Sequence, residues 1–438
     1  MAKFYGTLVK RRDCPPDCRA CQEACAKTLG TAEAVIKAEK VHKTPRSKNI
    51  ACLQCAEPEC VSACAVGALS KSEEDGIVRV LKEECIGCES CVSACKYGNM
   101  FFNQETGTAY KCEVCNGDPS CVKACPYTVL EYVNDMENLR SYLHTEDLFT
   151  SGVGLCSGCP IETMSRLTGK VLGDNVVLFG TPGCCSRITQ GVNLKASARV
   201  PTYFCLMTNA ASTAAGAKRY YQKTGQDIMT VVIVGDGATA DVGFAGLSGA
   251  AERGENIIYI CLDNEAYMAT GIQKSGTTPF AAWTFTSPIG KNRGGRSNNA
   301  KYMPLIMADH GIPYTATATV SHLEDYARKL EKAKLVKDGL VYIHVFSPCY
   351  TGWRASEDAS VEISRMAVET NYFPLWECER GKFTINYRPK NPLPITEFTK
   401  LTGRHRHLRQ AELKKFQGMV DDRLNLIESL TRLEKSVA

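Results

Sequence analysis

The sequence predicts a doubly wound, parallel-sheet α/β domain that is preceded by a small, cysteine-rich α+β domain. Two observations lead to this prediction. Between residues 152 and 395, short β-branched runs alternate with helical stretches rich in Ala and Gly, which is typical of a parallel sheet with helices on both faces. Ahead of this region, the first 125 residues contain four groups of four cysteines.

The composition is that of an ordinary globular protein. Apolar residues make up 44% of the 438-residue chain and the formal net charge is +5, so the charge does not favour nucleic-acid binding. No stretch approaches the roughly 18 continuous apolar residues of a membrane-spanning helix. The N-terminus, MAKFYGTLVKRRD, lacks the apolar core of a signal peptide. We therefore expect a cytoplasmic protein without a membrane or nucleic-acid partner.

Residues 1–133 have the cysteine spacing of ferredoxins. Each group ends in Cys-x3-Cys, and in such proteins three close thiolates bind one [4Fe–4S] cluster while the fourth binds a neighbouring cluster. Disulfides and zinc are the alternatives, but cytoplasmic thiols stay reduced and zinc sites use two separated cysteine pairs. We expect up to four clusters, held by Cys14, Cys18, Cys21, Cys25, Cys52, Cys55, Cys60, Cys64, Cys85, Cys88, Cys91, Cys95, Cys112, Cys115, Cys121 and Cys125.

The first of these groups departs from the usual spacing. Three residues separate Cys14 from Cys18, where two are common, so whether this group binds a standard cluster stays open. A polar stretch at residues 134–151 follows the ferredoxin-like domain, and we interpret it as a linker that is helical over residues 134–150.

The third region, residues 152–395, contains four apolar runs that predict strands, at 176–179, 229–234, 257–262 and 340–346. Helices are expected between them, including 241–253 and 321–337. The second of these helices begins with a capping-box pattern, Ser321 to Glu324. Because ligands of doubly wound sheets bind at the carboxyl ends of the strands, the functional site is expected there.

A Gly-Asp-Gly turn directly follows one of these strands. It consists of Gly235, Asp236 and Gly237, and Asn264 lies just past the end of the next strand. The oxygens of Asp236 and Asn264 suit Mg²⁺, which prefers oxygen ligands and substrate phosphates. The glycines and the following helix N-terminus favour a bound phosphate. Gly-Asp-Gly alone is a common turn, but together with Asn264 it predicts a metal–diphosphate site.

The stretch from GDGATADVGF to SGTTPF resembles the β subunit of 2-oxoacid:acceptor oxidoreductases, the pyruvate:ferredoxin oxidoreductase family. The similarity runs from about Leu155 to Trp353. It implies a thiamine diphosphate-binding domain in which Asp236, Asn264 and the carbonyl of Ala266 hold Mg²⁺. It also implies one [4Fe–4S] cluster beside the thiamine, with Cys185 as an alternative to Cys184 among its ligands. The implied ligands are Cys156, Cys159, Cys184 and Cys349.

The resemblance further implies oxidative decarboxylation of a 2-oxoacid, with transfer of the acyl group to coenzyme A. The N-terminal clusters would carry the electrons outward. In this family the glutamate that activates thiamine lies on another subunit, so this chain is expected to act only with α- and γ-type subunits. A purely electron-transferring iron–sulfur subunit is the alternative, and the intact pair Asp236 and Asn264 argues against it.

Ala269 bears on the choice of substrate. Pyruvate-specific members carry Asn at the matching position, and Ala removes a polar contact and opens space for a bulkier 2-oxoacid. An alanine without consequence is an equally good interpretation. The fused four-cluster domain resembles members that convert phenylglyoxylate into benzoyl-CoA, with a flavoprotein that passes electrons to NAD. Pyruvate or a branched-chain 2-oxoacid, with ferredoxin as acceptor, is the alternative.

The resemblance to four-cluster ferredoxin subunits also implies how the cysteine groups interlock. The first group would pair with the fourth, and the second with the third. The last region, residues 396–438, is predicted to be a helical tail, whose apolar face would pack on its own domain or on a partner. The basic stretch at residues 404–407 is expected to be a solvated surface. The apolar face consists of Leu413, Phe416, Val420, Leu424, Ile427 and Leu430.

Overall fold

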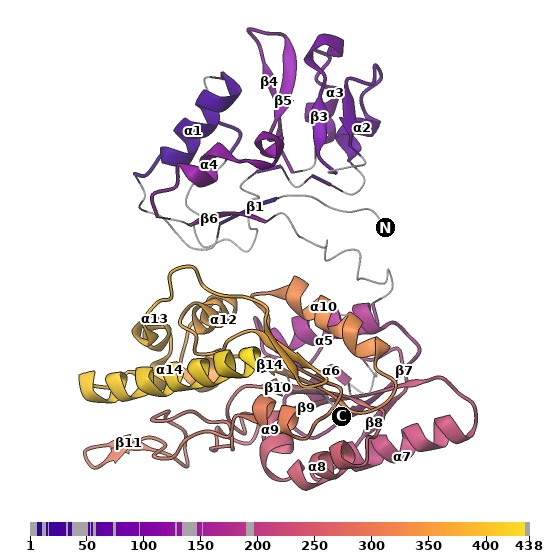
Figure 1. The fold of residues 1–438 in the computed structure, drawn as a ribbon, viewed down its shortest axis with the longest axis vertical. Coiled ribbons are helices and arrows are strands. Elements are labelled where there is room, and N and C mark those ends of the chain that lie inside the picture. Colours follow the sequence, from indigo (N-terminus) through magenta and orange to yellow (C-terminus); the bar gives the residue numbers. More distant parts are fainter. Residues whose placement is uncertain are drawn as a thin grey trace. The chain divides into compact units, whose positions relative to one another are not determined.

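The structure is a computed structural model that divides into two compact units, which we describe separately (Figure 1). The N-terminal unit is Met1–Ser141 and the C-terminal unit is Tyr142–Ala438. Cys14 and most of the expected linker helix lie outside the described residues. The structure describes residues 7–10, 15, 17–31, 34–36, 51–52, 54–55, 58–72, 76–95, 97–127, 129–133, 147–150, 152–189 and 197–433.

The N-terminal unit is a small α+β fold, as predicted. Its short helices pack in two pairs, α1 (Ala20–Leu29) with α4 (Ser120–Lys123) and α2 (Glu59–Ser62) with α3 (Ser90–Ala94). Each of these helices contains at least one cysteine of the four groups. Three antiparallel strand pairs complete the described part of the unit: β1 (Thr7–Lys10) with β6 (Leu130–Val133), β2 (Leu69–Lys71) with β3 (Val78–Val80), and β4 (Met100–Asn103) with β5 (Thr108–Lys111).

The C-terminal unit is built on an eight-stranded sheet with the order β16-β15-β13-β14-β10-β9-β7-β8. The six strands from β13 to β8 run parallel, which confirms the predicted fold class. The two edge strands β15 and β16 are antiparallel additions. The strands are β7 (Val176–Gly180), β8 (Thr202–Phe204), β9 (Met229–Gly235), β10 (Ile258–Asp263), β13 (Tyr314–Thr319), β14 (Val341–Phe346), β15 (Trp376–Glu379) and β16 (Lys382–Ile385). A separate hairpin joins β11 (Ile289–Gly290) and β12 (Arg293–Gly294).

Helices cover both faces of this sheet (Figure 1). On one face α5 (Pro160–Leu172) packs against α10 (Leu323–Leu335). The opposite face is covered by α7 (Ala210–Lys223), α8 (Phe244–Glu252) and α9 (Met303–Asp309). The central strands therefore have no solvated face, which explains their continuous apolar runs. The other helical segments are α6 (Ser186–Thr189), the π-helical turn η4 (Gly237–Asp241), α11 (Tyr350–Trp353), α12 (Ser360–Glu369), α13 (Ile395–Lys400), η5 (Gly403–His405) and α14 (Gln410–Arg432).

The C-terminal tail packs on its own unit. Phe416 and Val420 of α14 are buried in a core cluster with α12 and α13, and Ile427 packs beside β15 and β16. The expectation of a solvated basic stretch is wrong for Arg404 and His405, which are both 2% exposed. Arg404 is buried because its guanidinium pairs with Glu265 inside the protein.

Two local features also differ from the sequence-based expectation. The capping box does not form at α10, because the Ser321 hydroxyl hydrogen-bonds the ring of His322, and no side chain caps the helix. Of the expected linker helix only residues 147–150 are described, and Phe149 forms an isolated β-bridge with Ala198 instead. No helix in the described ranges combines the length and apolarity needed to cross a membrane.

Candidate active site

The parallel sheet brings four chain segments to one edge of the C-terminal unit. Strands β7, β9, β10 and β14 are neighbours and point the same way, so their carboxyl ends meet at one edge. The register places Gly235 beside Leu262 and Phe346 beside Asp263. The residues that follow these strands are the ones singled out in the sequence: Cys184, Asp236, Asn264 and Cys349.

Asp236, Asn264 and Ala266 bring oxygen atoms together as the ligands of a cation would. The side-chain oxygen of Asn264 faces Asp236 Oδ1 at 3.3 Å and the Ala266 carbonyl oxygen at 2.7 Å. Turning the amide would make its nitrogen donate to both atoms, whereas a cation between the three oxygens would bind them as they stand. Asp236 is 2% exposed, and burial, followed by the charge of Asp263, raises its pKa well above the usual range. A bound Mg²⁺ would offset the cost of burying this carboxylate.

A chain of buried hydrogen bonds, which the sequence did not indicate, extends from Asp236 into the sheet. The Thr277 hydroxyl lies 3.1 Å from Asp236 Oδ2 and 2.8 Å from Asp263 Oδ1. Asp263 Oδ2 lies 2.9 Å from His344 Nε2, and the Tyr342 hydroxyl lies 2.7 Å from His344 Nδ1. The one sequence feature that points to this hydrogen-bond chain is His344, which lies within the apolar run at 340–346. A fully buried histidine needs polar partners.

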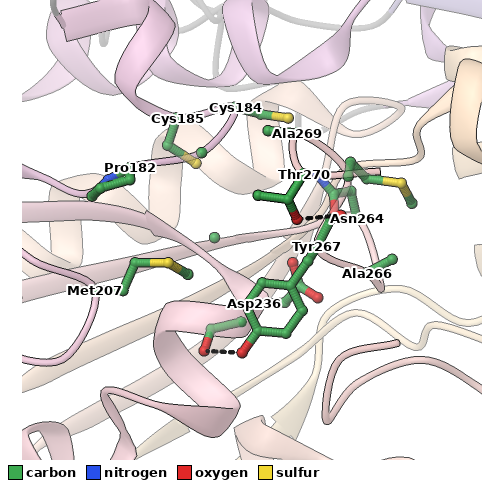
Figure 2. Close-up of a pocket in the computed structure, with 14 residues that line it drawn as sticks. Pro182, Cys184, Cys185, Met207, Asp236, Asn264, Ala266, Tyr267, Ala269 and Thr270 are labelled. Atoms are coloured by element: carbon green, nitrogen blue, oxygen red, sulfur yellow. Dashed lines mark hydrogen bonds between the residues drawn. The ribbon is translucent and has the colours of Figure 1, made fainter. Parts of the chain in front are cut away.

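The oxygen cluster borders a pocket that Figure 2 shows in close-up. The ring of Tyr267 packs so close to Gly237 that a Cβ there would meet it at 2.3 Å, so this position requires glycine. The Tyr267 hydroxyl donates to the Gly237 carbonyl at 3.2 Å. Backbone amides at such a glycine turn can approach a phosphate closely. The lining residues are Pro182, Gly183, Cys184, Cys185, Met207, Gly235, Asp236, Gly237, Asn264, Ala266, Tyr267, Met268, Ala269 and Thr270.

An ion pair between Glu265 and Arg404 holds the loop after β10 in place. Glu265 adopts a left-handed backbone conformation with φ of 61°, which is costly for a residue with a side chain. Its carboxylate pairs with Arg404 and accepts a hydrogen bond of 2.6 Å from the Tyr372 hydroxyl. The Arg404 guanidinium stacks on Trp353, 3.5 Å from the ring centroid, and the Trp353 indole donates to the Asn264 carbonyl. The basic stretch of the tail thus positions the candidate metal ligand.

The thiols of the four cysteines predicted beside the pocket are close enough to affect one another's pKa. Burial raises the pKa of Cys159 to about 12, and the thiols of Cys184, Cys349 and Cys156 contribute to the rise. Burial likewise raises the pKa of Cys184 to about 11, with contributions from Cys349 and Cys156. Iron binding would deprotonate these thiols, so four cysteines grouped in this way could hold a metal cluster.

Cys184 and Cys185 differ in their surroundings. Figure 2 shows their sulfur atoms pointing in different directions. The Cys184 thiol interacts with Cys349 and Cys156. The Cys185 thiol is 3% exposed and its main neighbours are Cys184 and Asp236. Of the two thiols, only Cys184 has Cys156 and Cys349 among its main electrostatic neighbours, whereas both thiols interact with Cys159.

In the N-terminal unit, the second and third cysteine groups form two cavities with exchanged cysteines. One cavity is lined by the first three cysteines of the second group together with the last of the third: Cys52, Cys55, Cys60 and Cys95. The other is lined by the first three cysteines of the third group together with the last of the second: Cys85, Cys88, Cys91 and Cys64. This exchange is the ligand pattern of two adjacent [4Fe–4S] clusters.

The fourth group shares its site with the last cysteine of the first group. Burial raises the pKa of Cys121 to about 12, and Cys112, Cys25 and Cys115 are the next largest causes. Helices α1 and α4, which carry Cys25 and Cys121, pack against each other. The other set, made of the first three cysteines of the first group and the last of the fourth, would contain Cys14, which lies outside the described residues.

Two family models match the chain. The model described as thiamine pyrophosphate enzyme, C-terminal TPP binding domain, matches residues 182–345. These residues include the Gly-Asp-Gly turn, Asn264 and the strands around them. The model described as 4Fe-4S dicluster domain matches residues 47–135, which contain the second, third and fourth cysteine groups.

Curated relatives match nearly all or about two thirds of the chain. The NADH-dependent phenylglyoxylate dehydrogenase subunit beta of Aromatoleum evansii is 37% identical over 98% of this chain and 99% of its own length. The pyruvate synthase subunit PorB of Methanothermobacter thermautotrophicus is 45% identical over 63% of this chain and 96% of its own length. The ketoisovalerate oxidoreductase subunit VorB of Pyrococcus furiosus is 39% identical, over 66% and 93% respectively.

Proposed function

The chain belongs to the family of β subunits of CoA-acylating 2-oxoacid oxidoreductases, and on this premise we propose that its substrate is phenylglyoxylate, which is converted into benzoyl-CoA. As a member of this family it binds thiamine diphosphate, Mg²⁺ and [4Fe–4S] clusters and works with other subunits. The bound thiamine supplies the decarboxylation chemistry.

The choice of substrate rests on how much of the chain each relative matches. The match to the phenylglyoxylate dehydrogenase subunit covers 98% of this chain, whereas the pyruvate synthase subunit leaves more than a third of the chain unmatched. The pocket supports the same choice, because Pro182, Met207 and Met268 line it and Ala269 stands at its exposed rim. Apolar lining of this kind favours a phenyl group over the methyl group of pyruvate.

Pyruvate is the second candidate, and a specific observation favours it. Within the part that they share, the pyruvate synthase subunit is 45% identical, which is more than the 37% of the phenylglyoxylate relative. A direct assay of both acids decides between them.

We propose that the loops after β9 and β10 bind the cofactor. Asp236, Asn264 and the Ala266 carbonyl hold Mg²⁺ against the diphosphate, and the turn from Gly235 to Gly237 supplies backbone amides that contact the phosphates. The proximal cluster is bound by Cys156, Cys159, Cys184 and Cys349. The N-terminal clusters are bound by the exchanged cysteine sets. Iron analysis of Cys184→Ser and Cys185→Ser proteins tests the choice between these neighbours, and only the first is expected to lose iron.

The protein residues provide binding, orientation and an exit for electrons. Asp236 and Asn264 fix the diphosphate end of the cofactor, and the apolar pocket excludes water from the reacting end. The cysteine sites would hold [4Fe–4S] clusters, which would supply one-electron transfer. We propose that α- and γ-type subunits complete the site, that one of them holds the thiamine-activating glutamate, and that a flavoprotein subunit passes the electrons to NAD.

The assay compares 2-oxoacids with the co-purified complex. CoA and NAD are supplied, and phenylglyoxylate, pyruvate and 2-oxoisovalerate are each offered in turn. We expect phenylglyoxylate to have the highest kcat/KM, and acid release to yield thiamine diphosphate from the complex. A higher kcat/KM for pyruvate would overturn the substrate, whereas absence of thiamine diphosphate would overturn the catalytic role itself.

Ala269 offers a matched pair of variants for the same assay. Ala269→Asn adds both volume and an amide at the pocket rim, and Ala269→Leu adds similar volume without the amide. We expect both to lower kcat/KM for phenylglyoxylate, and only Ala269→Asn to raise it for pyruvate. Equal behaviour of the two variants with pyruvate would show that volume alone acts at this position.

A further inference from the structure

The N-terminal unit contains a buried lysine between two of its proposed cluster sites. Lys111 ends β5, directly before Cys112, and is 1% exposed. Its ammonium nitrogen lies 2.5 Å from the Val78 carbonyl, 2.9 Å from the Cys112 carbonyl and 3.1 Å from Gln54 Oε1. Three acceptors match the three N–H donors of an ammonium group, while a neutral amine has only two. None of the three acceptors carries a charge, so the charge of Lys111 is not neutralised by its hydrogen-bond partners.

Gln54 joins this lysine to the second cysteine group. It lies between Cys52 and Cys55, is 1% exposed, and has a left-handed backbone with φ of 50°. Its carbonyl accepts from the Val78 amide at 3.0 Å and from Lys111, and its amide donates to the Cys112 carbonyl at 2.8 Å. Every polar atom of the Gln54 side chain is therefore engaged in holding the ammonium between the two cysteine loops.

The ammonium of Lys111 lies beside both sites. Lys111 directly precedes Cys112 and donates to its carbonyl, so the charge lies next to the fourth-group site. Lys111 also donates to Gln54, which stands between Cys52 and Cys55 of the second-group cavity. One cation therefore lies close to both proposed clusters.

We propose that Lys111 sets the reduction potentials of the two clusters that flank it. One is the cluster of Cys52, Cys55, Cys60 and Cys95, and the other is the cluster of Cys112, Cys115, Cys121 and Cys25. This inference rests on the cluster ligands proposed above. Reduction adds one electron to a cluster without moving a proton, and a fixed buried cation stabilises that added charge in a low-dielectric interior. Lys111 therefore makes both clusters better acceptors for electrons that come from 2-oxoacid oxidation.

The test is a redox titration of the purified complex, followed by electron paramagnetic resonance, on the wild type and on Lys111→Met and Lys111→Arg. For Lys111→Met we expect the reduction equilibrium of two clusters to fall at least tenfold, which is a shift of about 59 mV to lower potential for a one-electron couple. Lys111→Arg keeps the charge and should stay close to the wild type. Lys123→Met is the matched control, because Lys123 also lies in the fourth cysteine group but its side chain is 65% exposed and its charge is screened by water.

Iron and acid-labile sulfide are counted for every protein. Unchanged potentials in an iron-replete Lys111→Met protein, or a shift no larger than that of Lys123→Met, would overturn the proposal. If Lys111→Met loses iron, Gln54→Glu takes its place, because a carboxylate at this position neutralises the ammonium while it still accepts from Lys111. An iron-replete Gln54→Glu protein with wild-type potentials would also overturn it. A wild-type complex without [4Fe–4S] signals would instead contradict the proposed cluster ligands.

Discussion

Thr277 has one hydroxyl hydrogen and two buried carboxylates within reach. Its oxygen lies 3.1 Å from Asp236 and 2.8 Å from Asp263, so it donates to only one of them at a time. A cation at Asp236 leaves the Thr277 hydrogen free for Asp263, which His344 also supports. Thr277 then orients Asp263, whose Oδ1 accepts from the Glu265 amide at 2.7 Å in the loop that carries Asn264.

We predict that Thr277→Val weakens binding of Mg²⁺ and thiamine diphosphate by about 10- to 100-fold, which is the usual cost of removing a residue that orients a metal ligand. Thr277→Ser keeps the hydroxyl and is the control. Isothermal titration of cofactor-depleted complex with thiamine diphosphate and Mg²⁺ measures the affinity without any turnover. Equal affinities of the Val and Ser proteins would show that the hydroxyl has no part in the site.

At the residue scale, the sequence was informative where one short motif contained the chemistry. Asp236 and Asn264 follow two successive strands, and the cysteine groups have characteristic spacing, so they could be named in advance. Thr277 and Arg404 could not be named, because the contacts that define them join residues 41 and 139 positions apart. No local pattern encodes such a contact, and only the folded sheet edge brings the partners together.

The segment η5 links the C-terminal tail to the site. Arg404 stacks on the ring of Trp353 and pairs with the carboxylate of Glu265. Trp353 belongs to α11, which begins directly after Cys349, so the same contact supports the proposed cluster ligand. Arg404 therefore connects the C-terminal tail with the loop that carries Asn264 and with the segment that carries Cys349.

We predict that Arg404→Met lowers the stability of the C-terminal unit by about 3–5 kcal/mol, because it leaves the buried Glu265 carboxylate unpaired. The double variant Arg404→Met with Glu265→Gln should recover part of this loss, since it removes both charges. The three tryptophans, Trp283, Trp353 and Trp376, all lie in this unit, so urea unfolding followed by tryptophan fluorescence reports on it alone. A double variant less stable than Arg404→Met would contradict an ion-pair role.

At the element scale, the central strands were predictable and the sheet edges were not. The four expected runs became β7, β9, β10 and β14, because strands buried on both faces need continuous apolar sequence. Strands β15 and β16 have a mixed pattern in which residues such as Glu377 and Lys382 interrupt the apolar positions. Glu377 is nonetheless buried, where Tyr314 donates to it at 2.6 Å, and such pairing is decided by tertiary contacts.

The molecule as a whole is longer than some of its relatives. The pyruvate synthase subunit covers 63% of this chain and still spans 96% of its own length, so a family member can lack a counterpart of more than a third of this chain. In the function proposed above, the clusters of the N-terminal unit are additional electron carriers. The proposed exchanged cysteine sets place clusters next to one another within the unit, as an electron path requires.

We predict that Cys91→Ser interrupts this path without disturbing the thiamine site. Cys91 is buried in the cavity with Cys64, Cys85 and Cys88, and loss of one thiolate removes or alters that cluster. The complex should keep its thiamine diphosphate and its rate with a small artificial one-electron dye that accepts from the proximal cluster. Its rate of NAD reduction should fall at least tenfold. The dye assay is the internal control for intact catalysis, so an unchanged NAD rate in a protein that has lost cluster iron would show that the electrons leave the C-terminal unit by another route.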